Sequence, residues 1–209
     1  QKAEDALRSR GIVSTIVVFG SARVREGNPW YEAARQFGKI ASELGGALDG
    51  KDGGKRHVIA TGGGPGIMEA ANRGAAEAGA VTIGFNITLP HEQEPNAYST
   101  PDLTFRFHYF AMRKMHLAMR ASALVVFPGG FGTMDELFEI LTLRQTGKAP
   151  KVPIVLFDRT YWEEAINLDV FCAHGMIDAA DRELFCYADS AETAWSTLLE
   201  QGINHPVHS

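Results

Sequence analysis

One stretch constrains the fold of this chain most: an apolar segment that runs directly into a glycine-rich turn and then into a helix. Residues 123–127 (ALVVF) predict a buried strand, residues 128–132 (PGGFG) follow, and Thr133 is expected to begin the helix. Glycine lets the backbone approach a ligand closely, and the free N–H groups at a helix start favour an anion such as phosphate. The stretch therefore predicts a phosphate-binding turn with two carboxylates, Asp135 and Glu136, beside it.

The start of this helix has a second interpretation. Thr133 and Glu136 have the spacing of a capping box, in which the glutamate only closes the helix N-terminus. Both interpretations stay open, because the same residues serve either one.

The pattern of strand, glycine turn and helix occurs twice more. Residues 15–19 (TIVVF) precede Gly20 and Ser21, and residues 57–60 precede residues 61–66 (TGGGPG). Strands that alternate with helices predict a parallel sheet covered on both faces, here a Rossmann-like, doubly wound α/β fold. Ligands of such folds bind at the carboxyl ends of the strands. The turn residues that we expect to face one crevice there are Gly20, Ser21, Gly63, Gly64, Gly129 and Gly130.

The 209 residues are enough for one domain with a full core. We expect this domain at residues 15–201, an N-terminal arm at 1–14 and a disordered tail at 202–209. Further strands are predicted at residues 81–85, 103–109, 153–157 and 184–188. Helices are predicted at residues 2–10, 29–44, 67–78, 110–121, 133–146, 161–174 and 191–201.

Several classes of partner are not expected. The dinucleotide fingerprint G-x-G-x-x-G does not follow the first strand, and no G-x-x-x-x-G-K-[ST] occurs. The inferred ligand is therefore a mononucleotide or a sugar phosphate, with no cofactor and no metal. The net charge of −5 does not favour nucleic acid, and no apolar run approaches the ~20 residues that span a bilayer. Cys172 and Cys186 are expected to be buried free thiols, which favours a cytoplasmic location.

Three motifs in one order carry a resemblance to a known family. Residues 62–68 (GGGPGIM) resemble the motif GGGxxGxM, and residues 128–136 (PGGFGTMDE) match PGGxGTxxE in full. Between them, Arg113 and Lys114 match the family's Arg-Lys pair. Over about residues 15–178 the chain resembles the LONELY GUY (LOG) family, the cytokinin riboside 5′-monophosphate phosphoribohydrolases, whose sequences have often been labelled lysine decarboxylases.

This resemblance implies hydrolysis of the N-glycosidic bond of a purine nucleoside 5′-monophosphate to the free base and ribose 5-phosphate. It implies that Arg113 and Glu136 are catalytic. It also implies a homodimer or higher homo-oligomer, with the Arg-Lys helix and the helix after the PGG turn near the dimer interface. The substrate-binding residues expected from the resemblance and the turns are Gly20, Ser21, Gly63, Gly64, Glu92, Lys114, Gly129, Gly130, Gly132, Thr133, Asp135 and Thr142.

The implied roles suit the chemistry. Glycosidic cleavage passes through an oxocarbenium-like state, which a carboxylate stabilises. Glu136 can act in this way or orient the attacking water as a general base. Arg113 stays protonated, so it suits phosphate or the charge that develops on the leaving base.

Alternatives remain on the substrate and on the class of protein. Residues 86–98 (NITLPHEQEPNAY) form a longer segment than the compact family pattern and look like those of larger bacterial members, some of which act on AMP. A non-catalytic carrier of a nucleotide or of molybdenum cofactor is the second hypothesis, and a different sugar-phosphate enzyme is the third. Met112, Met115 and Met119 recur at helical spacing, which favours core or dimer packing.

Overall fold

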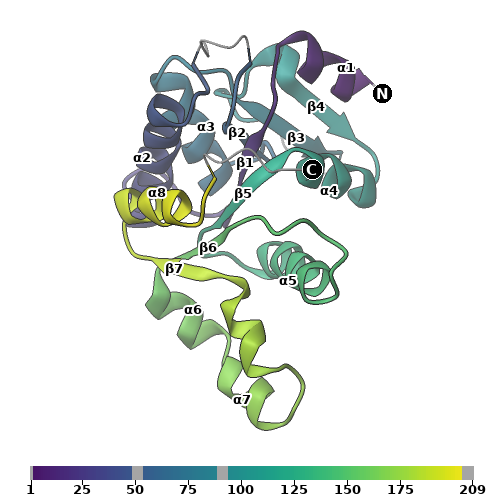
Figure 1. Ribbon diagram of the computed structural model, residues 1–209. Helices are drawn as coiled ribbons and strands as arrows, with labels where there is room; N and C mark the ends of the chain where they lie inside the picture. The colour runs from purple at the N-terminus through teal and green to yellow at the C-terminus, as the bar shows by residue number, and fades with distance from the viewer. Residues whose placement is uncertain (1, 49–53, 89–93, 204–209) are drawn as a thin grey trace.

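The structure, a computed structural model, describes residues 2–48, 54–88 and 94–203, which form one seven-stranded sheet with helices on both faces (Figure 1). The strand order is β4-β3-β2-β1-β5-β6-β7, and all neighbouring strands are parallel. This confirms the predicted Rossmann-like fold. The strands are β1 Thr15–Phe19, β2 Val58–Thr61, β3 Ile83–Ile87, β4 Thr104–Phe107, β5 Ala121–Val126, β6 Ile154–Phe157 and β7 Cys186–Ala188.

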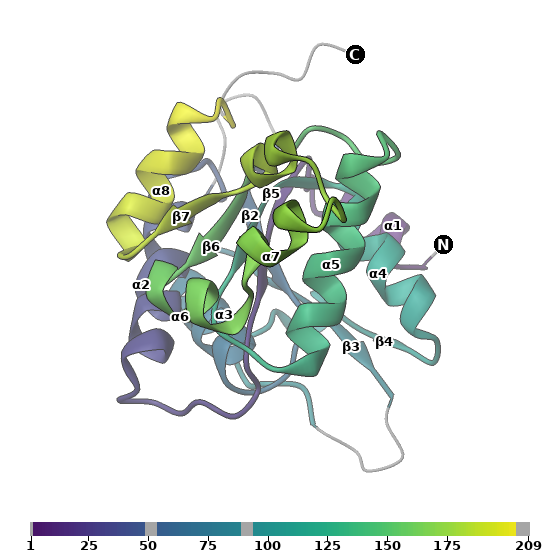
Figure 2. The ribbon, with the colours of Figure 1, turned by 90° about the horizontal axis from the view of Figure 1, so that it is seen from below.

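The helices divide between the two faces of the sheet (Figures 1 and 2). Helices α2, α3 and α8 pack on one face, and α1, α4, α5 and α6 contribute buried side chains to the other. The helices are α1 Lys2–Ser9, α2 Pro29–Leu44, α3 Ile67–Glu77, α4 Phe110–Met119, α5 Phe131–Gln145, α6 Arg159–Ala165, α7 Leu168–Ala173 and α8 Ala191–Glu200. Two short 3-10 helices, which the sequence did not predict, are η1 Pro101–Leu103 and η2 Ala179–Leu184.

The apolar run of β1 follows from its position at the centre of the sheet. Successive strand side chains point to opposite faces, so Ile16 and Val18 lie in one core cluster while Val17 and Phe19 lie in the other. All four are almost completely buried. A strand covered on both faces needs apolar residues at every position, which is why this segment does not alternate.

The topology places a crevice between β1 and β5. The chain builds the sheet outward from β1 through β2, β3 and β4, and then returns to pair β5 with the other side of β1. The connections that leave β1 and β5 therefore run to opposite faces of the sheet and separate above these two carboxyl ends. Such a reversal of strand order is where ligands bind in open α/β sheets.

Two predicted helices were placed incorrectly. Helix α5 begins at Phe131, two residues before Thr133, and its N-cap Gly130 has no side-chain cap. The helix expected over residues 161–174 is two helices, because the backbone becomes extended at Ile166 and Asn167 then caps α7 by accepting the N–H of Val170.

The N-terminal arm is packed against the sheet domain. Leu7 of α1 is buried in the same cluster as Leu117 of α4, and the carboxylate of Glu4 accepts a hydrogen bond from Arg120 at 2.7 Å. At the other end, Ile203 packs into the opposite cluster. The two cysteines are free thiols as expected, but each is only partly buried.

Candidate active site

The three glycine turns meet around one cavity of about 590 Å³ at the carboxyl ends of β1, β2 and β5. We call it the turn cavity. Its lining residues come from the turns, from the end of β3, and from α3, α4 and α5: Phe19, Gly20, Ser21, Ala22, Arg23, Gly62, Gly64, Met68, Asn86, Ile87, Arg113, Gly130, Phe131, Gly132, Thr133 and Glu136.

The first turn, after β1, is held by backbone hydrogen bonds to both of the other turns. The N–H of Ser21 donates to the carbonyl of Pro128 at 3.0 Å, and the carbonyl of Ser21 accepts the N–H of Ile67 at 2.9 Å. A Cβ on Gly20 would lie 2.7 Å from side-chain atoms of Ile67. This close packing leaves room only for glycine and brings the starts of α3 and α5 to the same cavity.

The second turn, after β2, depends on buried polar side chains. Gly63 has φ of 72°, and its carbonyl accepts hydrogen bonds from Asn86 Nδ2 at 3.1 Å and from the N–H of Asn96 at 2.9 Å. Asn96 Nδ2 also donates to the carbonyl of Gly64 at 3.1 Å. Gly64 lines the turn cavity, while Gly63 supports the turn from behind.

The third turn leads into α5 without a capping side chain. Thr133 is 6% exposed, and a Cβ on Gly129 would lie 2.1 Å from its Oγ1. The capping-box interpretation is wrong, because Gly130 is the cap and Glu136 bonds to another helix. The first N–H groups of α5 therefore have no side-chain cap at the cavity, as a phosphate-binding helix start requires.

Glu136 of α5 and Arg113 of α4 form an ion pair in the wall of the turn cavity. Arg113 Nη2 donates to Glu136 Oε1 at 2.8 Å, and the side chains are only 12% and 14% exposed. Burial raises the pKa of Glu136 to about 7, although the charges of Arg113 and Lys114 oppose this shift. A carboxylate with a pKa near neutrality is suited to proton transfer. The structure thus brings together the two residues that the sequence singles out as catalytic.

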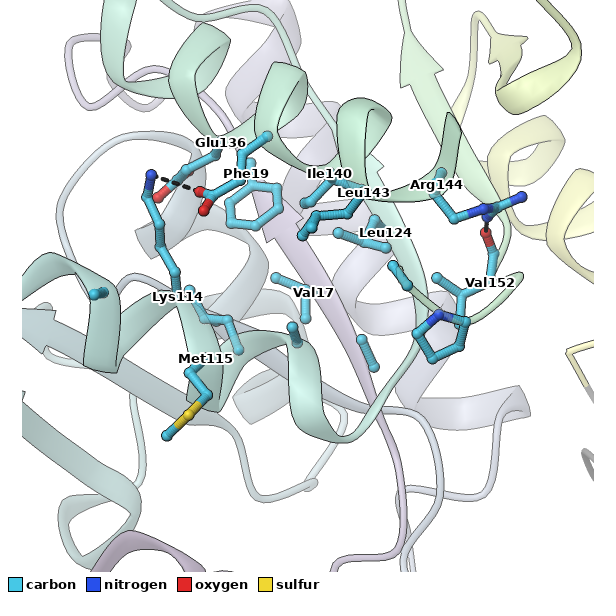
Figure 3. A pocket seen from close by; sticks show the side chains of 17 residues that line it. Val17, Phe19, Lys114, Met115, Leu124, Glu136, Ile140, Leu143, Arg144 and Val152 are labelled. Carbon is cyan, nitrogen blue, oxygen red and sulfur yellow. Dashed lines mark hydrogen bonds and ion pairs between the residues drawn. The ribbon is translucent and has the colours of Figure 1, made fainter. Parts of the chain in front are cut away.

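Lys114 and Asp135, the sequence neighbours of Arg113 and Glu136, form a separate ion pair. Lys114 Nζ contacts Asp135 Oδ2 at 2.7 Å and Glu139 Oε2 at 2.6 Å. Lys114 lines a second cavity, of about 260 Å³, which we call the helix groove. Figure 3 shows it between α4 and α5, with Lys114 and Glu136 at one end, Arg144 at the other and apolar side chains between them.

The helix groove and the turn cavity share two wall residues, Phe19 and Glu136. Figure 3 shows Ile140 and Leu143 projecting from α5 over Val17 and Leu124 of the sheet. The groove is lined by Val17, Phe19, Ala111, Lys114, Met115, Leu117, Ala118, Ala121, Leu124, Glu136, Glu139, Ile140, Leu143, Arg144, Ala149, Pro150 and Val152.

Five predicted substrate-binding residues do not line the turn cavity: Gly63, Lys114, Gly129, Asp135 and Thr142. Thr142 is exposed, and its hydroxyl donates to the carbonyl of Phe138 one turn earlier at 2.7 Å. Glu92 lies outside the described residues. Sequence reasoning missed two polar residues that line the cavity, Arg23 and Asn86. Only their positions in the sequence could have indicated them: Arg23 follows the first turn, and Asn86 directly follows the third predicted strand.

Neither a metal-ligand cluster nor a membrane-spanning helix is present in residues 2–48, 54–88 and 94–203. No group of three or more His, Cys, Asp or Glu side chains there is arranged to hold a metal ion. No helix in these ranges combines the length and the apolar character needed to cross a membrane.

Comparison with known proteins agrees with the motifs. A family model described as "possible lysine decarboxylase" matches residues 68–198. A probable cytokinin riboside 5′-monophosphate phosphoribohydrolase from Oryza sativa subsp. japonica is 30% identical over 91% of this chain and 79% of its own length. The chain belongs to the LOG family. A cytokinin riboside 5′-monophosphate phosphoribohydrolase from Arabidopsis thaliana is 26% identical over 71% of the chain and 69% of its own length. Another relative of that name, from Rhodococcoides fascians, is 24% identical over 78% and 81%.

Solved structures confirm that this LOG-family chain has a fold found in other proteins. A molybdenum cofactor binding protein from Rippkaea orientalis matches with a TM-score of 0.58 and 22% identity, over 90% of this chain and 96% of that one. A molybdenum cofactor carrier protein from Chlamydomonas reinhardtii matches with a TM-score of 0.58 and 23% identity, over 90% and 97%. At this identity the likeness concerns the fold alone.

Proposed function

We propose that this LOG-family protein hydrolyses the N-glycosidic bond of purine nucleoside 5′-monophosphates of the cytokinin type, releasing the free base and ribose 5-phosphate. The observation that carries the proposal is the buried pair of Arg113 and Glu136 in the wall of a cavity that also contains an uncapped helix start. One end of the cavity suits a phosphate, and the pair supplies a carboxylate and a cation for the reaction. The names of the curated relatives support the same activity.

The phosphate of the substrate is placed at the start of α5. Gly130, Gly132 and Thr133 line the cavity there, and helix N-termini bind anions through free N–H groups and the helix dipole. Arg23 is exposed at the same cavity and adds a positive charge from the first turn. Gly20, Ser21, Gly64 and these α5 residues then form the proposed phosphate and ribose contacts.

The ribose is placed against Glu136. As the bond between C1′ and the base nitrogen breaks, its electron pair leaves with the base, and positive charge develops on the sugar ring. The Glu136 carboxylate stabilises this charge and accepts a proton from the water that attacks C1′. The departed base takes up a proton in turn, which restores the carboxylate. Arg113 orients Glu136 through their hydrogen bond and stabilises the negative charge on the leaving base.

The substrate class is tested by turnover. Purified protein is incubated with isopentenyladenosine monophosphate and with AMP, and free base is followed by chromatography, with Glu136→Gln as the matched control. We expect base release by the unsubstituted protein and a loss of about 10²-fold or more in the variant. The ratio of the two rates distinguishes cytokinin activation from general nucleotide hydrolysis. If the protein binds AMP but releases base from neither nucleotide, the proposed enzymatic activity is contradicted and a carrier is favoured.

We further propose that a second copy of this chain covers the helix groove. Met112, Met115 and Met119 of α4 are 43%, 47% and 55% exposed, and Met115 lines the apolar groove of about 260 Å³. A homodimer through α4 and α5 would bury this surface. With the two free cysteines and a nucleotide substrate, this fits a cytoplasmic enzyme.

The dimer is tested by light scattering after size exclusion. Met115→Glu places a charge at the edge of the groove, and we expect it to shift the protein toward the monomer. Met176→Glu is the matched control, since Met176 is 70% exposed and does not line the groove. A monomeric unsubstituted protein at micromolar concentration would contradict the proposal.

A further inference from the structure

The third glycine turn is anchored from outside the turn cavity by Tyr161 of α6. The hydroxyl of Tyr161 donates to the carbonyl of Gly129 at 2.7 Å. On the opposite side, the N–H of Ser21 donates to the carbonyl of Pro128 at 3.0 Å. Two neighbouring carbonyls of the turn are thus held by separate elements, one by the first turn and one by α6. The tyrosine belongs to none of the motifs of the sequence and does not line the cavity.

The bond to Gly129 controls the direction of an N–H group in the turn. A trans peptide unit is planar, so its C=O and the N–H of the next residue point in opposite directions. The described residues contain no cis peptide bond. Because Tyr161 holds the Gly129 carbonyl toward α6, the Gly130 N–H points away from α6, and Gly130 lines the turn cavity.

This peptide unit needs such a constraint because both of its residues are glycine. Glycine populates backbone conformations that other residues avoid, so a Gly-Gly peptide can rotate at little steric cost. A Cβ at Gly129 would lie 2.1 Å from Thr133 Oγ1, whereas one at Gly130 would meet nothing within 4 Å, so packing leaves the Gly130 side of the unit unconstrained. Rotation would turn the Gly129 carbonyl toward the site of the phosphate and replace a donor with an acceptor.

Tyr161 is itself held in place by several groups. Its ring packs edge-on against Trp30, with centroids 5.4 Å apart, and against Trp162, at 5.3 Å. The carboxylate of Asp158 accepts the Tyr161 N–H at 3.2 Å and the Trp30 indole N–H at 2.9 Å. Asp158 also caps α6 with φ of 71°, in the left-handed region that few residues other than glycine, asparagine and aspartate adopt. The hydroxyl is therefore presented to Gly129 from a fixed position.

We propose that Tyr161 is a positioning residue for phosphate recognition: its hydroxyl fixes the Gly129–Gly130 peptide so that the Gly130 N–H faces the substrate phosphate. This inference rests on the proposed function of the same cavity. It assigns a role in substrate binding to a residue outside the cavity, and it makes α6 part of the machinery that distinguishes nucleotides from nucleosides.

The test compares phosphorylated and unphosphorylated ligands. Tyr161→Phe keeps the ring contacts and removes only the hydroxyl, and Tyr187→Phe is the control, because Tyr187 is partly buried nearby and does not contact the turn. Calorimetry measures binding of ribose 5-phosphate and of adenosine, and turnover of AMP gives KM and kcat. We expect Tyr161→Phe to weaken ribose 5-phosphate binding and raise KM by about 3- to 10-fold, the effect of one hydrogen bond, with adenosine binding and kcat unchanged.

Equal losses for ribose 5-phosphate and adenosine would overturn the inference, because a purely structural role affects both. The inference would also be overturned if Tyr161→Phe bound ribose 5-phosphate as well as Tyr187→Phe does. In that case, base release by the unsubstituted protein would still support the proposed function. If the unsubstituted protein neither binds ribose 5-phosphate nor releases base, both fail. Should Tyr161→Phe not fold, Trp30→Phe loosens the same support, and we expect a smaller, phosphate-specific loss of affinity; none would overturn the inference.

Discussion

The turn cavity and the helix groove share the walls Phe19 and Glu136 but differ in chemistry. The turn cavity is bordered by backbone turns, an uncapped helix start and the buried Arg113. The helix groove is bordered mainly by aliphatic side chains of α4, α5 and the sheet. Glu136 lies at their boundary, so its carboxylate has an ion-pair partner on one side and apolar surroundings on the other, and its pKa is raised to about 7.

Two neighbours in the sequence show what this difference means. Arg113 and Lys114 follow each other on α4, yet successive helix residues point in directions about 100° apart. Arg113 lies in the turn cavity with a partner that is 14% exposed, whereas Lys114 contacts Asp135 and Glu139, which are 63% and 45% exposed. Charges interact strongly where water is excluded and weakly where it is not. The two cations should therefore contribute very differently to function.

The largest effect is expected from Arg113→Ala. The change leaves the buried Glu136 without its partner and removes a cation from the turn cavity. We expect kcat for AMP or isopentenyladenosine monophosphate to fall by about 10²- to 10³-fold, the scale of losing one electrostatic contact in a transition state. Steady-state assays measure this, with Arg106→Ala, at an arginine 53% exposed on β4, as the control. A loss below threefold would show that the cation in the turn cavity contributes no more to turnover than an exposed one, which would contradict the proposed difference between the two cavities.

The second effect concerns the pH dependence that Glu136 imposes. Because its folded pKa of about 7 exceeds the ordinary value of 4.5, the native state holds the proton more tightly than the unfolded state. The free energy of unfolding should therefore fall as pH rises from about 4.5 to 7, by at most about 1.4 kcal/mol per pH unit. The rate should rise over the upper part of this range if the ionised carboxylate is the base.

Denaturant unfolding and initial rates between pH 5 and 8 measure both trends. Glu136→Gln cannot titrate, so its stability should lack this fall. The same decline in stability in both proteins would show that another group is responsible and that the boundary position of Glu136 does not perturb it.

Much of this architecture could be predicted because local signals agreed. The strand at residues 15–19 was predicted with its exact bounds, since a β-branched apolar run ends at glycine. The turns converge because a parallel sheet brings its carboxyl ends to one edge. The start of α5 was misplaced, because the Thr133–Glu136 spacing suits a capping box and local sequence does not reveal the partner of Glu136 on α4.

Other features could not be predicted because they depend on distant residues. Tyr161 reaches Gly129 across 32 positions of sequence, and nothing near Tyr161 indicates this contact. The raised pKa of Glu136 arises from burial, which depends on how α4 and α5 pack. The sequence placed Arg113 and Lys114 in one motif, but only the packing of α4 shows that they line different cavities.

An intermediate effect is expected from Leu124→Ala in the helix groove. Leu124 is 5% exposed on β5 and lies beneath α5 (Figure 3). Removing its side chain enlarges an existing apolar space, and we expect the free energy of unfolding to fall by about 2 kcal/mol. KM for nucleotide should stay within twofold, because Leu124 does not line the turn cavity. Denaturant unfolding and steady-state assays measure the two quantities, and a large rise in KM would show that substrate enters the groove.

The smallest effect is expected from Lys114→Met, which keeps an unbranched chain one atom shorter and removes its charge. Lys114 is 22% exposed, and its partners Asp135 and Glu139 are open to solvent, so its ion pairs should contribute about 0.2–1 kcal/mol. If Lys114 serves mainly to join α4 to α5, KM and kcat should change by less than about fivefold, the counterpart of that energy. Its expected contact with substrate stays a prediction, and steady-state kinetics decides it. A rise in KM of tenfold or more, confined to phosphorylated ligands, would place Lys114 at the phosphate. The helix groove would then be part of the substrate site at Lys114, and the proposed separation of the two cavities by function would be wrong.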